Sequence, residues 1–236
     1  MKCFIEDKEF GKISVELRRG MTSLRFGYKP DGSLLMRAPL GISIDELKRL
    51  VDIHREKLRN SPRPVVPEMH IGQVIEGFRC RIIIETISTQ PGFVQTRWEK
   101  GSLRVQVYEG ADLDDISTKK FVSDMMSQAM EIVAMMMLLP FAREVANGLG
   151  LKPAGFEIGS GMRKLGHCTG KKVIQLSRNI MFLSEDLVRY VICHELAHLT
   201  HMNHSPQFHA LCDQYTGGKE KELEQQLRQF RWPIMK

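Results

Sequence analysis

Apolar and polar residues alternate along much of the first hundred positions, which predicts β-strands. Apolar and polar positions alternate on both sides of PDGS, a turn sequence typical of a β-hairpin, within residues 12–43, KISVELRRGMTSLRFGYKPDGSLLMRAPLGIS. FRCRIIIETI (78–87) and SLRVQVYEG (102–110) show the same period of two. This pattern predicts a strand-rich N-terminal region over residues 1–110.

One helix interrupts these strands. Ser43 followed three residues later by Glu46 forms a capping box, and the apolar spacing that follows predicts a helix to about Arg59. The next segment, SPRPVVP (61–67), is rich in proline, and we expect an extended linker there.

The apolar period becomes helical in the second half of the chain. Residues 118–150 predict one long or kinked helix, with Pro140 as its break and Gly148 or Gly150 as its end. The segment KKVIQLS (171–177) predicts a short strand.

Two serines mark the starts of further helices. Ser184 precedes two acidic residues and an apolar helical stripe, and Ser205 precedes a proline suited to the first helical position. We therefore expect an α+β fold, with residues 111–236 forming a helical domain that contains a small sheet.

Composition narrows the possible classes of protein. The five cysteines are scattered without a C-x-x-C pair, and the first nine residues carry charges and no apolar leader, so we expect a cytoplasmic protein. The apolar run 132–142 is too short to span a bilayer, which needs about 20 residues, and predicts a buried core helix and no membrane contact. The net charge of +6 permits nucleic-acid binding, but scattered basic residues, as in RKLGHCTGKK (163–172), favour a solvated surface.

Five of the eight histidines lie within residues 193–209, CHELAHLTHMNHSPQFH. His194, Glu195 and His198 form the pattern H-E-x-x-H. On a helix the two histidines project from one face toward a shared metal ion. Glu195 lies about 100° around the helix, where its carboxylate can take a proton from a water on that metal.

A catalytic zinc ion usually has three protein ligands, so a third is required. We favour His204, because a helix that ends near residues 202–203, with Asn203 in the left-handed conformation, would fold the chain back over the metal. His201 is about 10.5 Å of helical rise from His194, too far to share one ion, and His209 is expected as a pocket wall. A downstream carboxylate is the alternative: Glu220, Glu222 or Glu224.

The segment YVICHELAHLTHMNHSPQF (190–208) resembles the YgjP-like metal-dependent hydrolases, metallopeptidase-type domains related to the WLM and SprT-like proteases. MRKLGHCTGKKVIQLS (162–177) resembles the same family more weakly. The resemblance implies a zincin catalytic domain in the C-terminal half, with ligands His194, His198 and His204 and the base Glu195.

The chain departs from that family pattern at four positions around the expected cleft. Leu165 and His209 stand where the family has tryptophan, His167 where it has serine, and Ser177 where it often has asparagine. These departures alter the substrate pocket and leave the ligands in place. His167, next to Cys168, could approach the metal from the side of the cleft.

We therefore expect a zinc-dependent hydrolase with one ion, or another first-row divalent metal, that cleaves peptide bonds in a peptide or protein substrate. Candidates for an additional hydrogen-bond donor are Tyr190, His201, His209 and Tyr215. The strand at 171–177 could be an edge against which an extended peptide lies. Two alternatives are a nucleic-acid-associated factor that acts on DNA-bound or RNA-bound proteins, and a non-catalytic metal-binding module.

Overall fold

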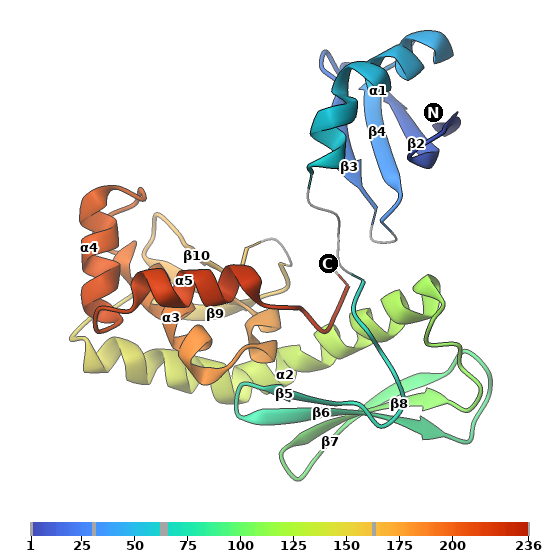
Figure 1. Cartoon of the computed structure of the whole chain (residues 1–236). Helices are drawn as coiled ribbons and strands as arrows, with labels where there is room; N and C mark the ends of the chain where they lie inside the picture. Colours follow the sequence, from blue (N-terminus) through green and yellow to red (C-terminus); the bar gives the residue numbers. More distant parts are fainter. Residues whose placement is uncertain (1, 30–31, 62–65, 162–163, 236) are drawn as a thin grey trace. The chain divides into compact units, whose positions relative to one another are not determined.

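A computed structural model describes all residues except 1, 30–31, 62–65, 162–163 and 236 (Figure 1). The chain forms two compact units, which divide between Val66 and Pro67. This division falls within the segment 61–67 for which the sequence predicts a linker, although residues 62–65 of that segment lie outside the described residues.

Unit 1 is a four-stranded sheet with one helix. The strand order is β1-β2-β4-β3; the central pair β2–β4 is parallel and both outer pairs are antiparallel. The elements are β1 (Lys2–Asp7), β2 (Gly11–Arg18), β3 (Arg25–Tyr28), β4 (Leu34–Pro39) and α1 (Ile44–Arg59). The predicted hairpin is β3–β4, and residues 30–31 of its PDGS turn lie outside the described residues.

The helix of unit 1 begins where the capping box predicts. The Ser43 hydroxyl oxygen accepts a hydrogen bond from the Glu46 backbone N–H at 3.2 Å. The Arg55 guanidinium ties α1 to the turn after β1, with one nitrogen 2.7 Å from Asp7 Oδ2 and the other 3.0 Å from Glu9 Oε2. An apolar cluster of α1 and sheet residues completes this unit.

Unit 2 contains a second four-stranded sheet, a long central helix and a three-stranded sheet with three shorter helices. The order of the first sheet is β5-β6-β8-β7, and that of the second is β10-β11-β9. The first part comprises β5 (Val74–Gly77), β6 (Cys80–Ile87), β7 (Val94–Glu99), β8 (Ser102–Tyr108) and α2 (Ile116–Gly148). The second comprises β9 (Gly155–Gly159), β10 (Gly166–Cys168), β11 (Val173–Ser177), the 3-10 helix η1 (Arg178–Phe182), α3 (Glu185–Ala197), α4 (Pro206–Tyr215) and α5 (Glu220–Gln229).

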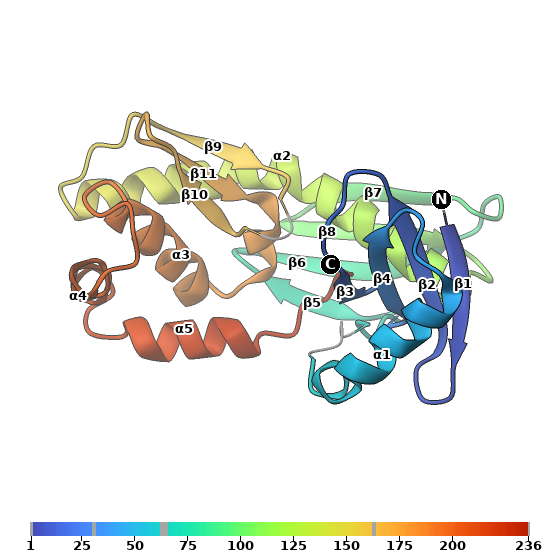
Figure 2. The same ribbon diagram turned by 90° about the horizontal axis from the view of Figure 1, so that it is seen from above.

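Helix α2 runs the length of unit 2 and contacts both of its sheets (Figures 1 and 2). The prediction of a break at Pro140 is wrong: α2 continues through it and ends at Gly148. Pro140 has no N–H to donate to the carbonyl of Met136, four residues earlier. Both residues are exposed, so this carbonyl lies on the solvent side of the helix, where water can donate a hydrogen bond to it. By length and composition alone α2 could also cross a membrane, a property shared by core helices of folded domains; twelve of its residues are buried.

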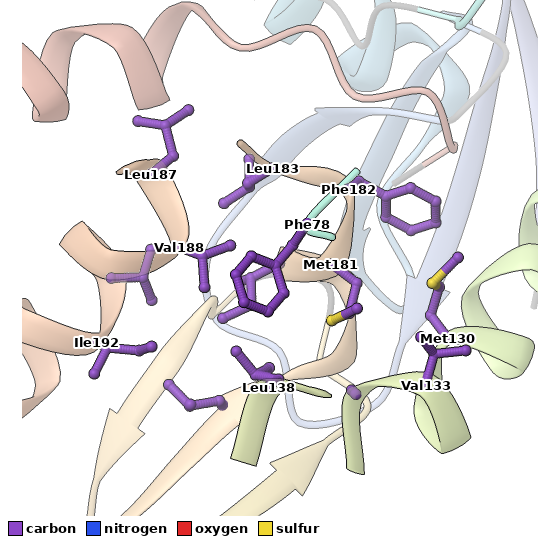
Figure 3. Close-up of a cluster of buried hydrophobic side chains, with 14 of the residues drawn as sticks. Phe78, Met130, Val133, Leu138, Met181, Phe182, Leu183, Leu187, Val188 and Ile192 are labelled. Carbon is purple, nitrogen blue, oxygen red and sulfur yellow. The ribbon is translucent and has the colours of Figure 1, made fainter. Parts of the chain in front are cut away.

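One apolar core joins both parts of unit 2. Phe78 lies between side chains of α2, such as Leu138, and side chains of α3, such as Val188 (Figure 3). Phe78 also contacts Phe141 of α2 with their rings tilted at 44° and ring centroids 5.0 Å apart. The sequence-based boundary at 110/111 therefore falls inside unit 2, because β5–β8 bury their apolar face against α2 and do not form a separate body.

The two four-stranded sheets have the same topology. In each, a parallel central pair is flanked by antiparallel outer strands, and a helix follows the fourth strand. The ladder registers also match, since Val15 pairs with Met36 as Ile84 pairs with Val105. Corresponding buried residues are 69 positions apart: Ile13 and Ile82, Val15 and Ile84, Leu34 and Leu103, Met36 and Val105, Ala38 and Val107.

Candidate metal centre

Three histidine side chains meet at the end of α3. His194 lies in its last turn, His198 is its C-terminal cap residue, and His204 precedes α4. The Nε2 atoms of His194 and His204 are 3.1 Å apart, and one ligand nitrogen from each of the three rings lies within 4.8 Å of the others. Among the described residues this is the one cluster of its kind that could hold a metal ion.

The chain reaches this arrangement by a shorter helix than the sequence predicts. Helix α3 begins after Ser184, whose hydroxyl oxygen accepts from the Leu187 backbone N–H at 3.5 Å, and ends at Ala197. The Ala197 carbonyl accepts from the N–H of both Thr200 and His201, which closes a tight turn.

The expected left-handed conformation at Asn203 is wrong. Among the described non-glycine residues, positive φ occurs at Arg79, Lys100 and Lys172. The chain reverses through the turn at 198–203 instead, and the Ser205 cap of α4 then fixes the residue before it, His204.

The spacing of His194 and His204 suits two ligands of one tetrahedral metal ion such as zinc. Two nitrogens bound at 2.0–2.1 Å around such an ion lie about 3.3 Å apart, close to the observed separation between His194 and His204. His198 Nδ1 lies 2.9 Å from the His201 carbonyl oxygen; donation from Nδ1–H to this oxygen leaves Nε2 of His198 with a free lone pair. His201 thus acts here through its backbone.

Burial keeps the centre in the protonation state that metal binding needs. Burial, together with the smaller effect of the neighbouring histidines, lowers the pKa of His194 to about 4. Burial also lowers the pKa of His198. Neutral imidazole is the form that binds a metal ion.

Phe208 forms the apolar floor of the centre. Its side chain is fully buried, and its ring centroid lies 4.4 Å from that of His198, 4.9 Å from His194 and 4.8 Å from His204. Because one rigid ring contacts all three imidazoles, α4 restricts their rotation as well as supplying the position of His204.

Glu195 lies beside the histidines and is held by β10. Its side chain is buried, and its carboxylate accepts a hydrogen bond from the Cys168 backbone N–H. It also lies directly against Gly166, where an added Cβ would be 2.6 Å from the carboxyl carbon. Burial raises the pKa of Glu195 to about 7, although the Cys168 N–H and the Lys164 charge act in the opposite direction. A pKa near the working pH suits a group that accepts and returns a proton.

These residues line an open cleft of about 370 Å³. One wall is β10 with Lys164, and the other is α3 with the segment 202–204. His167 lies on the β10 wall. Lys164, Gly166 and the backbone of Cys168 were missed by the sequence analysis, because a three-residue strand has no readable period.

The expectation of an edge strand at 171–177 is wrong. Strand β11 is the centre of its sheet, and β10 is the edge nearest α3. Leu165 and Thr169 exchange backbone hydrogen bonds with the strand at 173–177. By strand alternation, the backbone groups of Gly166 and Cys168 point away from β11. The Cys168 N–H points away from β11, because it donates a hydrogen bond to the Glu195 carboxylate.

The other candidate donors lie apart from the cleft. Tyr190 and Tyr215 line a second cavity, of about 370 Å³, although the Tyr190 ring is 6.1 Å from that of His194. Burial raises the pKa of both tyrosines.

His209 is held by one of the glutamates considered as alternative metal ligands. Its Nδ1 lies 2.6 Å from Oε1 of buried Glu220, and its ring is 6.3 Å from that of His204. Glu222 lines the second cavity. The structure does not bring Glu220, Glu222 or Glu224 into the histidine cluster.

Comparison with known proteins identifies one family. The family model described as YgjP-like, metallopeptidase domain, matches residues 22–230, nearly the whole chain. No curated protein and no solved structure matches the chain.

Proposed function

This chain belongs to the YgjP-like metallopeptidase domain family, and on that basis we propose that it is a zinc-dependent peptidase whose general base is Glu195. The observation that carries the proposal is the placement of one buried carboxylate beside three converging imidazoles in an open cleft. A metal ion belongs to this family's chemistry; zinc is our assignment, from the three nitrogen ligands and their spacing.

The histidines His194, His198 and His204 would hold the zinc. A zinc ion held there would activate water and polarise the substrate carbonyl. Glu195 accepts the proton of the attacking water and returns it to the leaving amine. Gly166 and Cys168 keep this carboxylate in place, because one leaves room for it and the other donates to it.

The edge of β10 supports a peptide as the substrate. By strand alternation its backbone groups at Gly166 point away from β11, the direction in which the Cys168 N–H reaches Glu195. An extended peptide could add to this edge through main-chain hydrogen bonds, which would place its carbonyl groups beside the histidines.

The alternative of a non-catalytic metal module has less support. Closed structural zinc sites use four protein ligands, whereas the cluster here has three and opens into a cleft. A buried glutamate beside a purely structural ion would also cost folding free energy without a compensating role.

The test combines metal analysis with one isosteric substitution. Purified protein supplied with zinc is expected to hold one ion per chain by mass spectrometry and to cleave a mixed peptide library. Glu195→Gln is expected to keep the ion and lose turnover by a factor of about 1,000 or more, as removal of a general base requires. Glu157→Gln, an exposed change on β9, is the matched control and should cleave normally. Full turnover in Glu195→Gln would overturn the mechanism.

A further inference from the structure

Two unpaired side chains project from the β10 wall of the cleft. Lys164 and His167 are both exposed and both line the cavity that contains the three histidines. Among the described residues, neither side chain has a hydrogen bond or an ion pair with the protein. The Lys164 ammonium is close enough to the centre to oppose the rise in the pKa of Glu195. Both groups are therefore available to a bound ligand.

The exposed charges around this wall are positive. Glu195 is the only carboxylate among the described residues that line the cleft. It is buried, and its carboxyl group accepts a hydrogen bond from the Cys168 backbone N–H. The loop between β10 and β11 adds Lys171 and Lys172, and the sequence from 163 to 172 contains no acidic residue. A ligand that lies along β10 meets positive charge and hydrogen-bond donors with no acidic competitor at the surface.

We propose that the cleft selects peptides that carry an acidic side chain next to the scissile bond, and that Lys164 and His167 are the specificity-determining residues. This inference rests on the proposed peptidase function and adds a substrate class to it. An extended peptide on the edge of β10 places alternate side chains over this wall. A substrate carboxylate there can accept from the Lys164 ammonium and from the His167 ring.

The arrangement suits a peptide carboxylate better than a nucleic acid. Nucleic-acid binding relies on many phosphate contacts spread along a surface, about 6 to 10 in strong cases. Here one cationic side chain, Lys164, lines the same cavity as the proposed catalytic group. A single local charge can select one side chain in a peptide.

Matched peptide pairs test this directly. Two fluorogenic peptides differ only in Glu or Gln beside the scissile bond, so that shape is constant and charge is not. The wild type is expected to cleave the Glu peptide with a kcat/KM roughly three- to tenfold higher, as a partly solvated ion pair with charged hydrogen bonds allows. This preference should shrink in high salt, because Lys164 is exposed.

Variants assign the preference to the two residues. Lys164→Glu should reverse the preference for the Glu peptide over the Gln peptide, and His167→Asn should weaken this preference. Lys221→Glu makes the same change in net charge on α5 without lining the cavity, and it should leave the preference unchanged. An unchanged preference in Lys164→Glu would overturn the assignment.

A binding measurement separates this inference from the proposed function. Affinities of the same two peptides for zinc-loaded Glu195→Gln are measured by fluorescence anisotropy, with a single-stranded oligonucleotide as competitor. If no peptide is cleaved by the wild type, the peptidase proposal fails, and the affinity ratio alone decides the charge selectivity. Equal affinities and equal rates for the two peptides overturn the selectivity and leave the peptidase proposal intact. Equal affinities with tight oligonucleotide binding would assign the wall to nucleic acid instead.

Discussion

The carboxyl group of Glu195 lies against the α-carbon of Gly166, which is 29 residues earlier in the chain, on β10. A methyl group at Gly166 would lie 2.5 Å from Glu195 Oε1. We predict that Gly166→Ala displaces the carboxylate and lowers kcat by about 100-fold, the scale on which small misplacements of reacting groups act. Zinc content should stay near one ion per chain, because none of the three histidines is touched.

Gly170→Ala is the matched control for this effect. Gly170 lies in the loop after β10, and a Cβ there meets nothing within 4 Å. The activity and zinc content of Gly170→Ala should equal those of the wild type. Equal kcat values for the two alanine variants would show that the contact with Gly166 does not position Glu195.

His204 is predicted to be the third metal ligand. His204→Ala should weaken zinc binding by about 100-fold or more, measured by competition with a chromogenic chelator. His201→Ala is the control, since the variant keeps the backbone carbonyl oxygen that accepts the hydrogen bond from His198 Nδ1. Retained zinc affinity in His204→Ala would favour a ligand from α5 that reaches the ion only after rearrangement.

A fragment of residues 67–235 is predicted to fold and to bind zinc. It keeps β5–β8 together with α2, whose buried residues share one core. A fragment of residues 111–236 loses that sheet, exposes Val122 and Met126 of α2, and should neither unfold cooperatively nor hold zinc. Circular dichroism during thermal unfolding and metal analysis distinguish the two. A cooperative transition in the shorter fragment would contradict the shared core.

Unit 1 should lose stability in acid through one ion pair. The Arg55 guanidinium holds the pKa of Asp7 well below its usual value of 3.8. The unfolded chain therefore binds this proton more tightly, so the ion pair stabilises the fold above about pH 4, and this stabilisation is lost as the pH falls toward the lower folded-state pKa. Asp7→Asn should cost about 1 kcal/mol at pH 7 and progressively less below pH 4.

Hydrogen exchange in β1 and β2 measures that effect in the full chain. Asp52→Asn is the comparison, because Asp52 bonds the same Arg55 at 2.6 Å but its side chain is 67% exposed. Asp52→Asn should change the hydrogen-exchange protection of β1 and β2 much less than Asp7→Asn does. A constant difference between wild type and Asp7→Asn from pH 7 to pH 2 would rule out this ion pair as the source.

Local signals in the sequence predicted local structure well. Ser43, Ser184 and Ser205 each cap a helix in the structure, because a hydroxyl oxygen and the N–H three residues later are close along the chain. The H-E-x-x-H spacing likewise brought His194 and His198 together, since four residues make about one helical turn.

Relationships that depend on tertiary packing were not readable. The contact between Gly166 and Glu195 joins a three-residue strand to a helix, and neither segment carries a pattern that reports the other. The pairing of His209 with Glu220 depends on the turn between α4 and α5. Pro140 lies within α2, whose packing on both sheets outweighs the local preference of proline.

The repeated strand order of the two sheets bears on the origin of the chain. Two successive segments with one topology, one register and buried positions 69 residues apart are what tandem duplication of a single gene segment would leave. The helix that follows the second sheet, α2, has 33 residues, and it contacts both sheets of unit 2 as well as α3. The helix that follows the first sheet, α1, has 16 residues, so unit 1 has the shared strand order and helix without the further elements that follow α2.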